Sequence, residues 1–120
     1  MKIAVASTGY NLDSNVSPIF GRSSAFIMVN LEDHEIKELF IIENHSKNEK
    51  GAGNTAAQFI SNQDINVLIS GKIGPVAFHI LKNAGIKIYK ITPGSVEKNL
   101  KLFNKGKLKE VTSLSGGFPA

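Results

Sequence analysis

Alternating stretches of apolar and polar residues divide this chain of 120 residues into strands, loops and helices. Short apolar runs bounded by turn residues predict buried strands over residues 3–6, 67–69 and 86–91. Two further strand-like segments, 25–31 and 36–42, are separated only by the polar stretch between them, which predicts an antiparallel hairpin.

Apolar residues at helical spacing predict three helices in the second half of the chain. The second helix opens at Pro75, where the missing N–H costs nothing, and Gly85 stands where a left-handed cap is expected. The third helix is expected to begin near Ser95. The three apolar stripes are Ala52–Thr55–Ala56–Phe59–Ile60, Ala77–Ile80–Leu81–Ala84 and Val96–Leu100–Phe103.

The order of these elements predicts the fold class. Strand–helix–strand units connect parallel neighbours through right-handed crossovers, while the hairpin adds an antiparallel edge. We therefore expect an α/β protein with a three-layer ribonuclease-H-like fold, a five-stranded mixed sheet and about three helices. We expect one domain over residues 1–108, followed by an irregular C-terminal tail over 109–120.

Composition restricts the chemistry that the chain can perform. It contains no cysteine, which excludes disulfides, thiolate metal sites and cysteine nucleophiles. The chain starts with a strand-like segment too short for a signal peptide, and its longest apolar runs, such as 39–42, cannot span a bilayer. We expect a cytoplasmic protein that does not associate with membranes.

The net charge of +4 is concentrated in the last third of the chain, which carries eight lysines and two glutamates. Lys98, Lys101 and Lys105 are spaced to share one helix face. Neither arginines nor aromatic residues are interleaved with them, so this pattern indicates a solvated lysine face rather than a nucleic-acid-binding surface.

Arg22 is the single arginine of the chain and follows Phe20 and Gly21 near the end of a long polar loop, 7–24. Its guanidinium offers a planar fork of donors suited to gripping anions. This loop follows the carboxyl end of a strand of the predicted parallel sheet, where ligands bind in such folds. Arg22 is thus either an anion clamp or a surface arginine that ties down a loop.

A second glycine-bearing loop, 70–75, also follows a strand end. Gly71 and Gly74 would let the backbone approach a ligand, and free N–H groups near Pro75 at the helix start favour an anion. Lys72 could add a point charge. The spacing matches neither a phosphate-binding P-loop nor a dinucleotide fingerprint, and a tight strand–helix turn explains the same residues.

Among the three histidines, His45 is the candidate metal ligand, because it follows the hairpin at the start of the glycine-bearing loop 44–54, near a pocket. A single histidine without a cysteine or carboxylate cluster is a poor site for a bare metal ion, although a preassembled cluster needs fewer protein ligands. His34, in the hairpin turn, and His79, off the apolar stripe of its helix, are expected to be exposed.

A catalytic function finds little support. A ribonuclease-H-like nuclease needs several carboxylates at the sheet to hold two metal ions, and the first strand, 3–6, carries none. No serine lies in a Gly-x-Ser-x-Gly motif, and no histidine–acid pair is recognisable. We therefore expect a protein that is not an enzyme.

Three segments together resemble the dinitrogenase iron–molybdenum cofactor biosynthesis family, which includes NifX-like proteins and the C-terminal domain of NifB. The first combines the N-terminal strand through Ser7 with Val16-Ser17-Pro18-Ile19-Phe20-Gly21-Arg22-Ser23 and 26–29. The others are 67–77, which contains Ser70-Gly71-Lys72-Ile73-Gly74-Pro75, and 81–89. The similarity covers residues 1 to about 108.

The resemblance implies non-catalytic binding, carrying or storage of an anionic iron–sulfur or iron–molybdenum type cluster, with cluster donor or acceptor proteins as partners. The cluster would rest between loops 7–24, 44–54 and 70–75, with His45 as metal ligand. The cofactor-binding candidates are Ser7, Phe20, Gly21, Arg22, Gly71, Lys72, Gly74 and Pro75. The alternative is a small-ligand or protein-interaction module without a metal cluster; a nucleic-acid binder is a third option.

Overall fold

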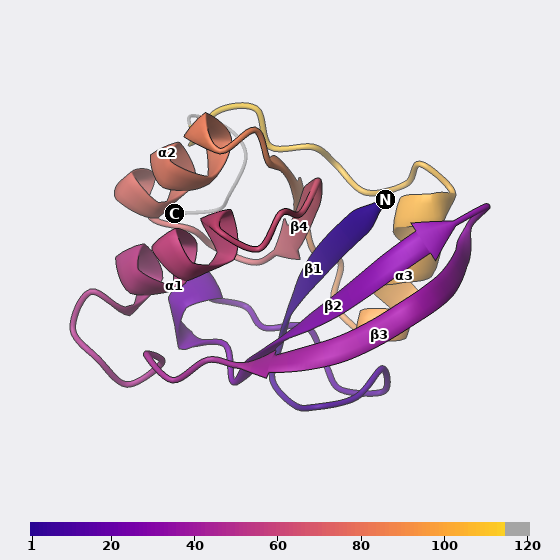
Figure 1. The fold of residues 1–120 in the computed structure, drawn as a ribbon, viewed down its shortest axis with the longest axis horizontal. Coiled ribbons are helices and arrows are strands. Elements are labelled where there is room, and N and C mark those ends of the chain that lie inside the picture. The colour runs from indigo at the N-terminus through magenta and orange to yellow at the C-terminus, as the bar shows by residue number, and fades with distance from the viewer. Residues whose placement is uncertain (115–120) are drawn as a thin grey trace.

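A mixed sheet of five strands forms the middle layer of the protein (Figure 1). We analysed a computed structural model, which describes residues 1–114. The strands are β1 (Lys2–Ser7), β2 (Ala25–Glu32), β3 (Glu35–Glu43), β4 (Val67–Ser70) and β5 (Lys87–Lys90). They lie in the order β3-β2-β1-β4-β5, with β1, β4 and β5 parallel and β2 antiparallel to both of its neighbours. The expected fold class is confirmed.

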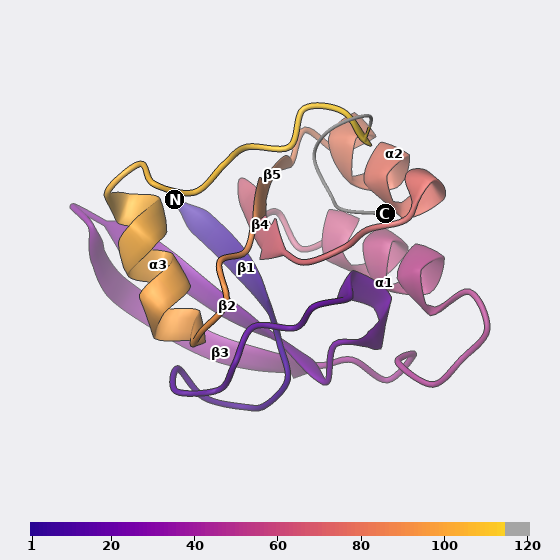
Figure 2. The ribbon, with the colours of Figure 1, turned by 180° about the vertical axis from the view of Figure 1, so that it is seen from behind.

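Helices cover both faces of the sheet (Figure 2). Helices α1 (Ala52–Ser61) and α2 (Pro75–Asn83) pack on one face, and α3 (Val96–Asn104) packs on the other. Alternating residues of each central strand supply the two cores, because successive side chains of a strand point to opposite faces. Ala4 and Met28 lie in the core under α1 and α2, whereas Ile3 and Val29 lie under α3.

The helix boundaries follow the signals in the sequence. Pro75 occupies the first turn of α2, and Gly85 adopts a φ of 81° after its end, a conformation that costs glycine little. Ser95 caps α3 by accepting a hydrogen bond from the Lys98 N–H at 3.0 Å. His34 and His79 are exposed, as expected.

Three expectations about burial are wrong, and the first concerns Thr55, which was expected on the buried stripe of α1 but is exposed. Phe59 was expected on the buried stripe of α1 but is 46% exposed, because α1 tilts this side chain toward a pocket beside β3. Ala84, expected on the stripe of α2, is exposed because it is the residue that ends this helix. Buried Phe78 fills that side of α2 instead.

The loop over residues 7–24 is held to the rest of the protein by backbone hydrogen bonds. It contains a short 3-10 helix, η1 (Phe20–Arg22), and pairs with the segment after β4 through the Phe20 N–H, which donates to the Lys72 carbonyl at 2.9 Å. The Val16 N–H donates to the Gly94 carbonyl at 2.9 Å. These contacts bring three separate loops to the carboxyl ends of β1 and β4.

The expected tail begins at residue 109. Of it, 109–111 lie along β5: the Val111 N–H donates to the Ile88 carbonyl at 2.7 Å, and Val111 is buried. The folded unit therefore extends at least to residue 111. The last six residues of the expected tail, 115–120, lie outside the described residues. No helix in the part of the chain that the structure describes is long and apolar enough to cross a membrane.

Candidate anion-binding site

The loops at the carboxyl ends of β1 and β4 enclose a pocket of about 390 Å³, named here the Arg22 pocket. Three short segments supply its walls, which are 19–22 from η1, 51–53 from the start of α1 and 72–74 before α2. Among the described residues 1–114, no carboxylate lines it, while Arg22 and Lys72 bring two cationic side chains. The pocket therefore favours an anion on charge alone.

Two helices begin at this pocket, and neither carries a side-chain cap. Gly51 precedes α1 and Gly74 precedes α2, and neither N-terminus has an acidic residue in its first turn. Among residues 1–114, the backbone N–H groups of Ala52, Gly53, Ile73 and Gly74 make no hydrogen bond. Unpaired amides at two helix N-termini form a positive surface for an anion, because the helix dipoles add to them.

Arg22 reaches across the rim of its pocket to the loop before α1. Its Nη1 donates to the Lys47 carbonyl at 2.7 Å and lies 3.4 Å from the Glu49 carbonyl oxygen. Within the described chain, Nη2 and Nε make no further hydrogen bond. Arg22 therefore ties down a loop, and it also keeps donors of its guanidinium for a ligand.

Close backbone contacts explain the glycines that immediately precede Arg22 and Lys72. A Cβ on Gly21 would lie 2.5 Å from the Gly53 nitrogen, so η1 packs directly on the first turn of α1. A Cβ on Gly71 would lie 2.3 Å from the Pro18 carbonyl oxygen. These glycines shape the pocket by letting its three walls meet, and Gly21 also lines it.

The remaining candidates have roles next to the pocket. Ser7 is buried, and its Oγ donates to the Gly9 carbonyl at 2.9 Å, which turns the chain out of β1. The Phe20 ring is buried in the core, 5.4 Å from the Phe26 ring centre, and anchors η1. Pro75 starts α2 and, with Ser7 and Gly71, is not among the residues that line the pocket.

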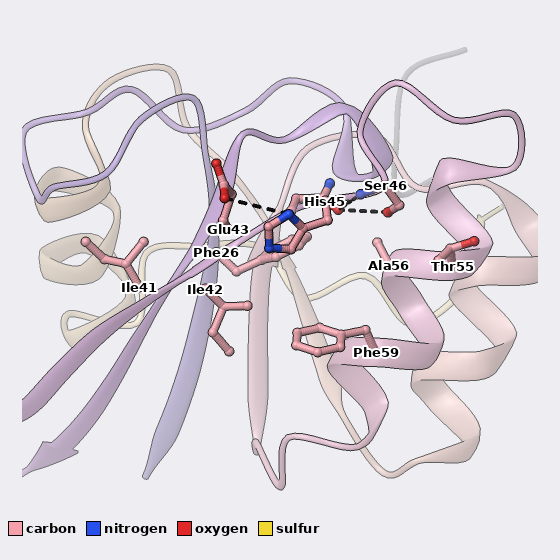
Figure 3. Close-up of a pocket in the computed structure, with 10 residues that line it drawn as sticks. Phe26, Ile41, Ile42, Glu43, His45, Ser46, Thr55, Ala56 and Phe59 are labelled. Carbon is pink, nitrogen blue, oxygen red and sulfur yellow. Dashed lines mark hydrogen bonds and ion pairs between the residues drawn. The ribbon is translucent and has the colours of Figure 1, made fainter.

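His45 lies in a second pocket of about 500 Å³ between β3 and α1 (Figure 3). Ile42 and Phe59 point toward one another across it, which makes its interior apolar. The His45 side chain is 85% exposed, and its Nδ1 lies 3.7 Å from Glu43 Oε2. The structure thus places His45 and Arg22 in different pockets, both of which use α1.

Glu43 links His45 to the first loop. The Tyr10 hydroxyl donates to Glu43 Oε1 at 3.1 Å. This hydrogen bond, together with the negative charge of the carboxylate, raises the pKa of Tyr10 above its ordinary value. In the described residues no group of three or more histidines, aspartates and glutamates is arranged to hold a metal ion.

Sequence reasoning did not single out Asn44 or the start of α1. Asn44 is buried, and its Nδ2 donates to the Gly21 carbonyl at 3.2 Å and the Ser23 carbonyl at 2.9 Å, so it fixes η1 against the loop after β3. An asparagine carries no signal for such a contact. The two glycines in Gly51-Ala52-Gly53, at the start of a predicted helix, were the signal in the sequence that a second turn with exposed backbone amides forms at the start of α1.

These features define a class of protein: a small α/β domain with a cationic pocket at its strand ends, into which two uncapped helix N-termini open. The chain belongs to the dinitrogenase iron–molybdenum cofactor family, whose model matches residues 1–106. It is 38% identical over 112 residues to an uncharacterised protein of Methanocaldococcus jannaschii, covering 92% of this chain and 95% of the other.

Solved structures agree with the family. The apo form of the orange protein from Desulfovibrio gigas is similar with a TM-score of 0.81 and 30% identity, covering 93% of each chain. A candidate NifB protein from Thermotoga is similar with a TM-score of 0.81 and 31% identity, covering 95% of this chain and 96% of that one. The resemblance found in the three sequence segments is confirmed.

Proposed function

We propose that this protein binds an anionic iron–sulfur or iron–molybdenum type cluster in the Arg22 pocket and carries or stores it without catalysing a reaction. The observation that carries the proposal is the pair of uncapped helix N-termini that open into one pocket with Arg22 and Lys72. By contrast, α3 begins away from this pocket and has Ser95 as its cap. Membership of the family supports the identity of the anion.

The donor set suits a cluster that arrives with its own inorganic ligands. The chain supplies no thiolate, and the pocket offers N–H donors and two cations rather than metal ligands. Sulfide or oxide ligands of a cluster would accept hydrogen bonds from the free amides, as other anions do at helix starts. The cluster is thus cargo, which donor and acceptor proteins would deliver and remove.

His45 is the candidate for a direct metal bond. Its exposed imidazole can present Nε2, because Nδ1 is the nitrogen that faces Glu43. His45 belongs to the neighbouring pocket, so such a bond requires a cluster that extends from the Arg22 pocket along the start of α1. A substitution at His45 tests this contact separately from the anion clamp.

Anaerobic reconstitution with iron and sulfide, with and without molybdate, tests the proposal. After desalting, we expect stoichiometric metal and charge-transfer absorption in the wild-type protein. Arg22→Ala should retain less metal and Arg22→Lys an intermediate amount, since lysine keeps the charge and loses the fork. Lys105→Ala, an exposed lysine on another surface, is the matched control. A colourless, metal-free wild-type protein would contradict cluster binding.

His45→Ala separates the two parts of the site. If the imidazole is a ligand, this variant should retain cluster with an altered visible spectrum, because one metal ligand is exchanged. An unchanged spectrum would remove His45 from the site and leave the clamp formed by Arg22 intact.

The second candidate function is a small-ligand module, and the apolar pocket beside His45 favours it. This pocket is lined by Ile42, Ala56 and Phe59, with Glu43 and His45 as polar groups, and it would suit an apolar molecule with one polar end. Phe59→Ala should then abolish binding of an apolar fluorescent probe while metal retention stays unchanged. If the wild-type protein and the Phe59→Ala variant bind the probe equally, this function is contradicted.

A further inference from the structure

Strand β3 is an edge strand with apolar residues that nothing in the described chain covers (Figure 1). It pairs with β2 on one side only, and it extends over nine residues. Leu39, Phe40 and Ile41 are 41%, 54% and 38% exposed. Long, apolar, unpaired edges readily accept another strand, which is why folded proteins usually protect them.

The hydrogen bonds of β2 show which groups of β3 face outward. Leu31 and Met1 exchange two backbone hydrogen bonds of 2.8 Å, so the odd-numbered residues of β2 face β1 and the even-numbered residues face β3. Phe40 pairs with Met28, an even-numbered residue, so its backbone groups face β2. The backbone groups of Leu39, Ile41 and Glu43 therefore point to the free edge.

The charges of β3 favour a register for a second copy of the same strand in which opposite charges meet. In an antiparallel pair related by a two-fold axis at Phe40, Leu39 lies opposite Ile41 and Lys37 lies opposite Glu43. The residues in both pairs are odd-numbered, so the outward-facing backbone groups of Leu39 in one copy can form hydrogen bonds with those of Ile41 in the other. The Phe40 residues of the two copies lie opposite each other as a non-hydrogen-bonded pair. An axis one residue earlier, at Leu39, would place Glu35 opposite Glu43, and like charges directly opposite are destabilising.

We propose that two copies of this protein associate through antiparallel pairing of their β3 strands about a two-fold axis at Phe40. Lys37 of each copy then faces Glu43 of the other, Leu39 packs on Ile41, and the two Phe40 rings meet on the face that also carries α1. The two sheets become one continuous sheet. A second copy fits this edge because the strand is complementary to itself in charge, in apolar pattern and in hydrogen-bonding direction.

The local protection of this edge lies at one end of the proposed segment. A β-bulge lies where the register shifts at Asn30 and Leu31, near the hairpin turn. Bulges of this kind discourage pairing. Residues 38–43 pair regularly with β2 beyond the bulge, and they supply the central pairs of the proposed register; Lys37, which faces Glu43 in it, is the residue at the register shift itself. The interface does not include Arg22 or Lys72, so a failure to dimerise and a failure of the anion clamp are separate results.

Charge reversal tests the register. The dissociation constant of the wild-type dimer is measured by sedimentation at micromolar to millimolar concentrations, with circular dichroism to confirm folding. Lys37→Glu and Glu43→Lys should each weaken the dimer about tenfold or more, because two attractive pairs become repulsive. A mixture of the two variants should recover the dimer, since both pairs become attractive again. Lys105→Glu, a reversal away from β3, should have no effect.

An engineered cysteine tests the axis directly, because the chain contains no cysteine of its own. Residues of a non-hydrogen-bonded pair have Cα atoms about 4.5 Å apart, within the range that a disulfide spans. Phe40→Cys should therefore form a disulfide-linked dimer on mild oxidation. Val76→Cys, at an exposed apolar position in α2, should remain largely monomeric.

Three results would overturn the proposal. The first is a wild-type protein that stays monomeric to millimolar concentration. The free edge of β3 would then pair with a strand of a different protein instead. The second is a dimer that neither charge reversal weakens. The third is equal cross-linking of the two cysteine variants.

Discussion

Gly71→Ala should destabilise the protein severely, because the loop after β4 crosses directly over the first loop at this point. The added Cβ would lie 2.3 Å from the carbonyl oxygen and 2.5 Å from the carbonyl carbon of Pro18, and 2.7 Å from the Ser17 carbonyl oxygen. All three are backbone atoms that cannot rotate away. The two segments would have to separate by roughly an ångström to reach ordinary contact distances.

The magnitude follows from what this separation disrupts. Overpacking of this kind costs about 1–3 kcal/mol. The separation also strains the bridge between the two segments, in which the Lys72 N–H donates to the Pro18 carbonyl at 2.8 Å and the Phe20 N–H donates to the Lys72 carbonyl at 2.9 Å. Loss of one such bond adds about 1 kcal/mol. We expect a total of about 2–4 kcal/mol.

Urea unfolding followed by circular dichroism measures this loss, and a thermal scan should show a Tm lower by roughly 8–16 °C. Gly74→Ala is the matched control, because a Cβ there meets no atom within 4 Å and its φ of −73° suits alanine. Gly74→Ala should lower the free energy of unfolding by no more than about 1 kcal/mol, since alanine is only a poorer N-cap than glycine there. Equal stability of the two variants would refute the reasoning that Gly71 is required by a backbone crossing.

Other predictions concern the residues around the two pockets. Asn44→Ala should lower the free energy of unfolding by about 1–3 kcal/mol in urea titrations, because it leaves buried carbonyl groups unpaired. A stability equal to that of the wild-type protein would contradict the role of Asn44 in holding η1 against the loop after β3. Arg22→Ala should lower the free energy of unfolding by less than about 1.5 kcal/mol in the same assay, since the hydrogen bonds of Arg22 to the loop before α1 are exposed. A larger loss of stability would make Arg22 mainly a structural residue. The Tyr10 hydroxyl should titrate above 10.0, and Glu43→Gln should lower its pKa, as followed by ultraviolet absorbance with the other tyrosine removed. Since the folded pKa is raised, the hydrogen bond stabilises the fold below the unfolded pKa, and this contribution disappears as the pH rises through the folded pKa; an unchanged Tyr10 pKa in Glu43→Gln would refute the cause.

The sheet and its helices could be predicted because each central element carries a local signal. The continuous apolar run over 67–69 fits only a strand buried on both faces, and Pro75 and Gly85 mark the two ends of α2. These signals depend on neighbouring residues, which the sequence displays directly. The order of the elements predicted the fold class, and the resemblance carried by the family segments, including the run Phe20-Gly21-Arg22, implied the same fold.

The contacts that complete the site could not be predicted in the same way. Arg22 donates to the carbonyl groups of Lys47 and Glu49, and a backbone carbonyl has no signature in the sequence. His45 follows β3 and yet lies in another pocket, because α1 starts between the two cavities. The exposure of Phe40 depends on how far the helices extend over the sheet, which a periodic pattern does not reveal.

The most direct test of the anion-binding account is an amide-proton NMR spectrum of the isotope-labelled protein before and after anaerobic reconstitution with iron and sulfide. The account predicts that the amide signals of Ala52, Gly53, Ile73 and Gly74 shift or broaden first, because their unpaired N–H groups would lie around the bound cluster. The signal of Gly106, beyond α3, should be unchanged. Bound metal that leaves these four signals unaffected while it alters others would contradict the Arg22 pocket as the binding site.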